Sequence, residues 1–222
     1  MTDTQPLRAF YLQNGEGEPS IFHIWEHGGA KGDSVTPSTY SDSYRNWMEE
    51  LLRKFLDENE GSSLLSVGCG NAAIEASLVA DGYRVLGVDA LEEAVALARH
   101  KGVDATCADV RTWTPPPGSW RLLYADGLFG HLHDPGDGLQ PVLRRFRSWL
   151  PENGGLVISN DGPRTASDIE PHPDVPGFVW LSGSYLQQQV EQAGFQDVSC
   201  ALFTYERPVS GPRERVIITA RA

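Results

Sequence analysis

Cysteine and long hydrophobic runs are scarce in this sequence of 222 residues. The three cysteines, Cys69, Cys107 and Cys200, are odd in number and widely spaced, so they form neither a disulfide framework nor a CxxC metal-binding pair. Free thiols indicate a reducing compartment, and we expect a cytoplasmic protein. No stretch reaches the roughly 18 apolar residues that span a bilayer, and residues 1–10 lack the apolar core of a signal peptide, so no membrane partner is expected.

Basic residues are also few. The chain has 18 Lys and Arg against 30 Asp and Glu, which gives a formal net charge of -12. Proteins that bind nucleic acid need a basic surface, because the neutralisation of phosphates supplies much of their affinity. The densest basic stretch, Arg144, Arg145 and Arg147, lies in a predicted surface helix. The charge therefore disfavours nucleic acid and other strongly acidic partners.

The first part of the chain differs in composition from the rest. Residues 1–38 are rich in Gly, Pro, Ser and acidic residues, yet they carry aromatic side chains, which a disordered tail usually lacks. We expect residues 1–40 to form an irregular cap over the remainder. His23 and His27 would form a metal-binding pair only on a helix, and Gly28 follows at once, so we expect no metal site.

From residue 41 onwards, short apolar runs alternate with stretches of helical periodicity, which predicts a single domain over residues 41–222. A first helix begins near Ser41, whose hydroxyl can cap it, and ends near Asn59. Strands are expected at 64–67, 84–88, 104–108, 121–125, 156–159, 197–205 and 215–220, and further helices at 73–80, 92–100, 139–150 and 184–193. This alternation indicates a parallel sheet with helices on both faces.

The last two predicted strands form an exception to the parallel pattern. Only a loop of about ten residues, 206–214, lies between them, and a helical crossover needs more. We therefore expect this pair to be antiparallel. The preceding stretch, residues 161–179, is rich in proline, which excludes a helix there. With Phe178 and Trp180 beside it, that stretch is either a substrate lid or a surface loop with an apolar anchor.

A glycine loop, Gly68-Cys69-Gly70-Asn71-Ala72-Ala73, follows the first strand and opens a helix. Gly68 permits a tight turn, Gly70 lets a ligand approach the backbone, and the helix N-terminus offers free N–H groups. Taken alone, the string fits the GxGxxA loop of dinucleotide-binding proteins. It is equally similar to the GxGxG loop of methyltransferases.

Two acidic residues follow the next two strands. Asp89 ends the second strand, 19 residues after Gly70 (89 − 70), and can accept hydrogen bonds from both hydroxyls of a ribose. Asp109 ends the third strand and can accept from the exocyclic amine of adenine, while the N–H of Val110 donates to the ring. The sequence therefore predicts a site for an adenosine-containing cofactor.

Together these motifs resemble the class I S-adenosylmethionine-dependent methyltransferases over about residues 41–222. The matching segments are Leu65–Gly70, Val88-Asp89, Ala108–Val110, Tyr124–Leu132, Gly154–Ile158 and Ala193–Phe195. The resemblance implies an α/β, Rossmann-like seven-stranded sheet in the order 3-2-1-4-5-7-6, with strand 7 antiparallel and helices on both faces. It also implies that S-adenosylmethionine is held by Ser66, Gly68, Cys69, Gly70, Asp89, Ala90, Asp109, Val110, Asp126, Tyr40 and Tyr44.

The chain departs from the family pattern at two positions. Ser66 stands where members often carry an acid that helps to bind the amino-acid end of the cofactor, and Ala72 replaces the third glycine of the loop. Ser66 has no charge to pair with an ammonium group. Backbone carbonyls, or Tyr40 and Tyr44 from the helix that covers the methionine moiety in many members, are alternative acceptors.

The loop Asp126–Asp134 matches the segment that passes close to the sulfonium in the family. An oxygen nucleophile usually needs a base with a pKa near 7, which favours histidine. His131 is therefore the candidate catalytic base, and its alternative role is packing. His133 is a second candidate that we expect to be more exposed.

The resemblance implies transfer of a methyl group to an oxygen or nitrogen of a small-molecule metabolite, by a monomer or a homodimer. Two alternatives stay open on the sequence alone. A nicotinamide-dependent oxidoreductase would need a Tyr-x-x-x-Lys pair or a second substrate domain, and neither is found. A protein that binds S-adenosylmethionine without methylating anything is the other.

Overall fold

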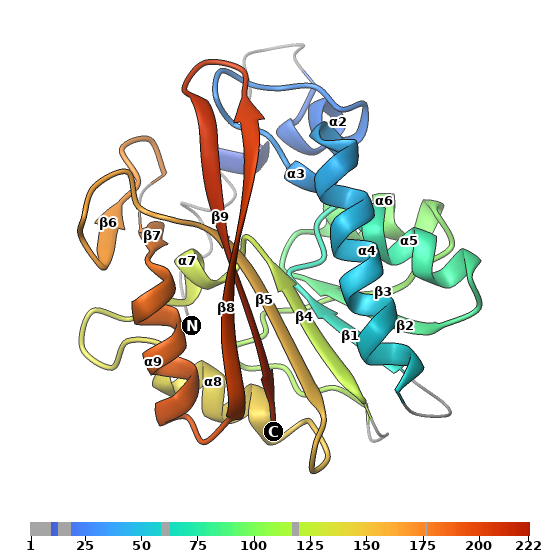
Figure 1. Cartoon of the computed structure of the whole chain (residues 1–222). Helices are drawn as coiled ribbons and strands as arrows, with labels where there is room; N and C mark the ends of the chain where they lie inside the picture. Colours follow the sequence, from blue (N-terminus) through green and yellow to red (C-terminus); the bar gives the residue numbers. More distant parts are fainter. Residues whose placement is uncertain (1–9, 13–18, 59–62, 117–119, 176) are drawn as a thin grey trace.

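A computed structural model describes residues 10–12, 19–58, 63–116, 120–175 and 177–222 (Figure 1). Its centre is a seven-stranded sheet in the order β3-β2-β1-β4-β5-β9-β8. The strands are β1 (Ser63–Val67), β2 (Arg84–Asp89), β3 (Asp104–Cys107), β4 (Leu122–Asp126), β5 (Gly155–Asp161), β8 (Gln196–Arg207) and β9 (Gly211–Arg221). The first five are parallel and β9 is antiparallel to β5. The predicted order is confirmed, because β8 and β9 are the sixth and seventh strands of this sheet.

Helices cover both faces of the sheet. They are α4 (Asp42–Asp57), α5 (Ala73–Ala80) and α6 (Glu92–His100), then α8 (Gln140–Arg147) and α9 (Gly183–Gln192). Neighbouring residues of a strand point to opposite faces, so Leu64 packs in a cluster with α4, α5 and α6, whereas Leu65 packs in a cluster with α8 and α9. Both leucines are fully buried, which fits a sheet covered on both sides.

The N-terminal segment is more regular than its composition predicts. It contains α2 (Ile21–Glu26), which Ser20 caps, and the short α3 (Pro37–Tyr40), which begins on a proline. The expectation of an irregular segment is wrong for these residues, because local capping compensates for a polar, glycine-rich composition. Ile21 and Trp25 pack with Leu91, which precedes α6, and with Ala94 on α6, so this segment has its own small core.

Two further elements lie near the carboxyl ends of the strands (Figure 1). The loop after β4 contains α7 (Phe129–Leu132), and the proline-rich stretch folds into the two-stranded β6 (Ile169–Pro171) and β7 (Val179–Leu181). As expected, the stretch forms no helix. None of the helices in the described residues has the length and apolar character needed to cross a bilayer.

The turn between β8 and β9 is shorter than predicted. The two strands pair from Arg207 and Gly211 onwards, so residues 208–210 connect them instead of a loop over 206–214. The prediction began the last strand at Arg215 and missed its start, because Arg213 stands where an apolar residue would mark a buried strand face. Arg213 is buried in the structure, as is Arg215. The antiparallel pairing itself is confirmed.

Gly130 allows α7 to pack against β7. A Cβ at this position would lie 2.3 Å from the carbonyl oxygen of Val179 and 2.5 Å from the ring of Phe178, so the backbone of β7 would have to shift. We expect Gly130→Ala to lower the melting temperature by about 3–10 °C, since overpacking a rigid contact costs about 1–3 kcal/mol. In the control Gly162→Ala, the new methyl would meet Val216 at an ordinary 3.5 Å, and its melting temperature should stay close to that of the parent. Equal shifts in thermal denaturation would contradict this account.

Candidate active site

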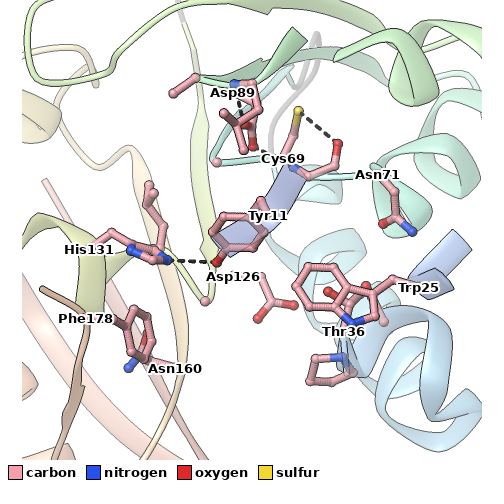
Figure 2. A pocket seen from close by; sticks show the side chains of 18 of the residues that line it. Tyr11, Trp25, Thr36, Cys69, Asn71, Asp89, Asp126, His131, Asn160 and Phe178 are labelled. Atoms are coloured by element: carbon pink, nitrogen blue, oxygen red, sulfur yellow. Dashed lines mark hydrogen bonds between the residues drawn. The ribbon is translucent and has the colours of Figure 1, made fainter. Parts of the chain in front are cut away.

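One cavity lies over the carboxyl ends of the parallel strands, where open α/β sheets bind their ligands. The glycine loop and the ends of β2, β3, β4 and β5 form its floor. Trp25 and Val35 of the N-terminal segment form one wall, and Phe178 and Trp180 of the proline-rich stretch form another. Segments far apart in the sequence therefore close around one space (Figure 2).

The glycine loop is fixed to the end of β2. The N–H groups of Gly68 and Cys69 donate to the Val88 carbonyl oxygen at 2.7 and 3.1 Å. Gly70 has a positive φ and open space where a side chain would be, so its backbone is accessible to a ligand. Ala72 adopts the left-handed conformation, with φ 53° and ψ 44°, although it is not a glycine. The substitution of the third loop glycine is therefore accommodated by the backbone.

Asp89 joins the glycine loop to the start of α6. Its carboxylate accepts from the N–H of Gly70 and from the N–H of Leu91, each at 3.0 Å. Burial raises the pKa of Asp89 above its usual value, although these N–H donors act against that rise. Asp89 therefore lines the cavity as a rigidly held acceptor. Just beyond β3, Asp109 is similarly fixed by the backbone N–H and the guanidinium of Arg111.

Asp126, at the end of β4, is the centre of a buried polar network. It forms an ion pair with Arg215 and accepts from the hydroxyls of Tyr44 and Tyr124, each at 3.1 Å. Tyr44 is fully buried, and its pKa is raised by that burial, so it stays a neutral donor. It supports Asp126 from behind and does not line the cavity.

Arg215 also reaches β5. Its guanidinium donates to the Asp161 carboxylate at 2.9 Å and to the Ser159 hydroxyl at 2.9 Å. Burial alone would raise the pKa of Asp161, but Arg215 and Arg207 outweigh it and hold that pKa below its usual value. Arg207 donates in turn to the backbone of Asp33, which ties the N-terminal segment to β8.

A carboxylate lies next to Ser66 in space. The Ser66 hydroxyl donates to Oε1 of Glu75 at 2.5 Å, and both residues are buried. Glu75 lines the cavity, whereas Ser66 does not. Burial raises the pKa of Glu75 to about 7. Sequence reasoning missed Glu75, although an acid in the first turn after a glycine loop was a visible signal.

His131 faces the cavity from α7 and contacts a residue of the N-terminal segment. Its Nε2 lies 2.9 Å from the Tyr11 hydroxyl, and its ring packs edge-on against Phe178. Figure 2 shows Tyr11 between Cys69 on one side and His131 on the other. Burial, helped by Arg111 and His172, lowers the pKa of His131 to about 4, so its imidazole is neutral at physiological pH. Nothing in the sequence indicated the contact with Tyr11.

Nine of the predicted site residues line this cavity: Gly68, Cys69, Gly70, Asp89, Ala90, Asp109, Val110, Asp126 and His131. Three do not. Ser66 and Tyr44 lie behind its wall, and Tyr40 lines a separate depression beside β8. His133 also lies outside it, with its ring 3.2 Å from the Tyr185 hydroxyl.

No group of three or more His, Cys, Asp and Glu is placed to hold a metal ion within the described ranges. His23 instead pairs with Glu93 at 3.0 Å, at the surface of α2.

Known proteins resemble this chain in sequence and in fold. A family model described as a methyltransferase domain matches residues 41–200. A relative from Pseudomonas amygdali pv. tabaci, described as a tabtoxin biosynthesis enzyme, is 41% identical over 209 residues, 93% of this chain and 82% of the relative. Two solved structures share the fold. A SAM-dependent methyltransferase from Archaeoglobus fulgidus has a TM-score of 0.65 and 16% identity, over 91% of this chain and 100% of its own. A phosphoethanolamine N-methyltransferase from Haemonchus contortus has a TM-score of 0.67 and 14% identity, over 90% of this chain and 56% of its own.

Arg215 is expected to be essential for stability at neutral pH. Arg215→Met leaves the partly buried Asp126 without its cation and the buried Asp161 with Arg207 alone, which should lower the free energy of unfolding by about 3–5 kcal/mol. The loss should shrink as the pH falls below the usual carboxyl pKa, because ionised Asp161 stabilises the fold only above that range.

Urea denaturation at two pH values measures this effect. Arg144→Met, on the exposed side of α8, is the control and should change the free energy of unfolding by about 0.5 kcal/mol or less. A deficit for Arg215→Met that does not depend on pH would show that lost packing, not charge, is responsible.

Proposed function

Because this chain belongs to the class I S-adenosylmethionine-dependent methyltransferases, we propose that it transfers the cofactor's methyl group to an oxygen or nitrogen of a small-molecule metabolite. Membership of the family sets aside the nicotinamide-dependent oxidoreductase that the glycine loop alone allowed. One observation carries the choice of a small substrate: the N-terminal segment and the proline-rich stretch close over the floor of the cavity. The description of the Pseudomonas relative as a biosynthesis enzyme supports an acceptor of that kind.

The residues of the floor fit the cofactor. The side-chain nitrogen of Asn71, on the glycine loop, is buried without a partner among the described residues and lines the cavity, so it can donate to a ligand. Asp89 and Ala90 would hold the ribose, and Asp109 and Val110 the adenine. S-adenosylmethionine supplies an electrophilic methyl group on a sulfonium, so the protein needs mainly to position the nucleophile.

We assign the role of cap to residues 1–40 and the role of catalytic domain to residues 41–222. In the described part of the cap, Phe22 and Trp25 present aromatic faces to the cavity while Ile21 packs on α6. Val175 and Phe178 face the same space from the proline-rich stretch. These apolar walls exclude water from the nucleophile, and their closure limits the size of the substrate.

His131 and Tyr11 are the groups that we propose to contact the nucleophile. Burial raises the pKa of the Tyr11 hydroxyl and lowers that of His131, so both are neutral at physiological pH. A proton leaving a hydroxyl or amine nucleophile can pass to the Tyr11 oxygen while the Tyr11 proton moves to Nε2 of His131. The pair thus offers a short route for the proton, and neither of its two members is ionised before the transfer.

The proposal is tested with S-adenosylmethionine carrying a 13C-labelled methyl group. A cell extract is divided by ultrafiltration into small-molecule and macromolecular fractions, and each is incubated with and without the enzyme. We expect the label in the small-molecule fraction, with the 13C chemical shift of an O-methyl or N-methyl group. Label found only in macromolecules, or a C-methyl shift, would overturn the proposal.

Substitutions at the proposed pair should affect catalysis more than cofactor binding. With an accepted substrate in hand, we expect His131→Ala and Tyr11→Phe each to lower kcat by about 100-fold, because each interrupts the proton route. The dissociation constant for S-adenosylhomocysteine should change little. His133→Ala is the matched control, since His133 lies outside the cavity, and should keep its activity. Near-normal kcat values in both variants would contradict the proton route and show that His131 and Tyr11 only pack against each other.

A further inference from the structure

We propose that Glu75 binds the α-ammonium group of the cofactor's methionine moiety and so replaces the acid that family members often carry at the position of Ser66. This inference depends on the cofactor alone and not on the substrate. Glu75 lies in the first turn of α5, directly after the glycine loop, and lines the cavity. Only 4% of its surface is exposed.

Glu75 differs from most of the other acidic residues of the cavity because no cation of the described residues pairs with its carboxylate. In the part of the chain that the structure describes, its carboxylate forms no ion pair, and its side-chain partner is the Ser66 hydroxyl. Lys101 acts on it only at a distance, because the Lys101 ammonium is bonded to Glu26 and to the Asn71 carbonyl oxygen. A buried carboxylate without a cation is unfavourable, so a cationic ligand would gain by pairing with it.

The other carboxylates that line the cavity are already satisfied. Asp126 and Asp161 are paired with Arg215, and Asp109 is paired with Arg111. Asp89 accepts hydrogen bonds from two backbone N–H groups. Among the acidic lining residues, Glu75 is therefore the one whose charge has neither a cation nor a pair of backbone donors.

Ser66 and Asn71 complete a site for an amino-acid group. Ser66 donates to Oε1 of Glu75, which fixes the carboxylate against the end of β1. Asn71, four residues before Glu75, carries the buried side-chain nitrogen that has no partner among the described residues. The same loop and helix therefore offer an acceptor for an ammonium group and a donor for a carboxylate.

Binding at Glu75 should be coupled to protonation. Because burial raises its pKa to about 7, a substantial fraction of the free protein carries the protonated acid at pH 7. An ammonium group favours the ionised form, so cofactor binding at this pH should release a proton. A role confined to packing would not produce that release.

Titration calorimetry with two ligands separates the amino-acid end from the adenosine end. S-adenosylhomocysteine carries both, whereas 5′-methylthioadenosine lacks the amino-acid group. Glu75→Gln should weaken the binding of S-adenosylhomocysteine by about 10- to 100-fold, which is the loss expected for a charged hydrogen bond. The affinity for 5′-methylthioadenosine should not change. Asp89→Asn is the comparison variant and should weaken the binding of both ligands.

Two further measurements complete the test. In wild type, the heat of binding S-adenosylhomocysteine at pH 7 should differ between buffers of different ionisation enthalpy, and in Glu75→Gln it should not. Moving the acid to the family's position, in Ser66→Asp with Glu75→Gln, should restore part of the affinity. Unchanged affinity in Glu75→Gln, or an equal loss for both ligands, would overturn the proposal.

The stability of Glu75→Gln keeps the test interpretable. The raised pKa means that the folded state favours the neutral acid, so wild type loses stability as the pH rises from the usual carboxyl pKa of 4.5 to about 7 and stays less stable above it. The glutamine variant removes that effect and should melt at a higher temperature than wild type at alkaline pH. Weaker binding in a variant that is at least as stable as wild type cannot come from misfolding.

Discussion

The buried guanidinium of Arg215 holds together the floor of the active site. It bonds to Asp126 at the end of β4 and to Asp161 at the end of β5, and it is itself part of β9. Three strands of the sheet are therefore joined by charged hydrogen bonds at the level where the cavity opens. Such a cluster is favourable only when every charge has a partner, and here Tyr44, Ser159 and Arg207 supply the remaining contacts.

This arrangement also connects the floor to the cap. Arg207 bonds to Asp161 on one side and to the backbone of Asp33 on the other, so the N-terminal segment is fixed to the turn end of the β8–β9 hairpin. Figure 1 shows α2 and α3 beside that turn. The walls of the cavity thus depend on the same group of charges as its floor.

The sheet order and most of the floor were predictable because they depend on local patterns. Gly68 and Gly70 mark the loop after β1, Asp89 is the last residue of β2, and Asp109 lies just beyond β3. What the sequence concealed are contacts between distant residues. Tyr11 meets His131 across 120 positions, and Arg215 reads as a surface residue until Asp126 and Asp161 are placed around it. Hydrophobic periodicity cannot report a buried charge whose partners come from other strands.

The hydrogen bond between Ser66 and Glu75 bears on how such enzymes are recognised. A search pattern that demands an acid two residues before the glycine loop would reject this chain, although a carboxylate reaches the same neighbourhood from the following helix. The position of a charge in three dimensions decides which ligand group it can bind, and a polypeptide can supply that charge from different positions in its sequence. Divergent members of a superfamily are therefore better compared by the chemical groups that surround a ligand than by aligned letters.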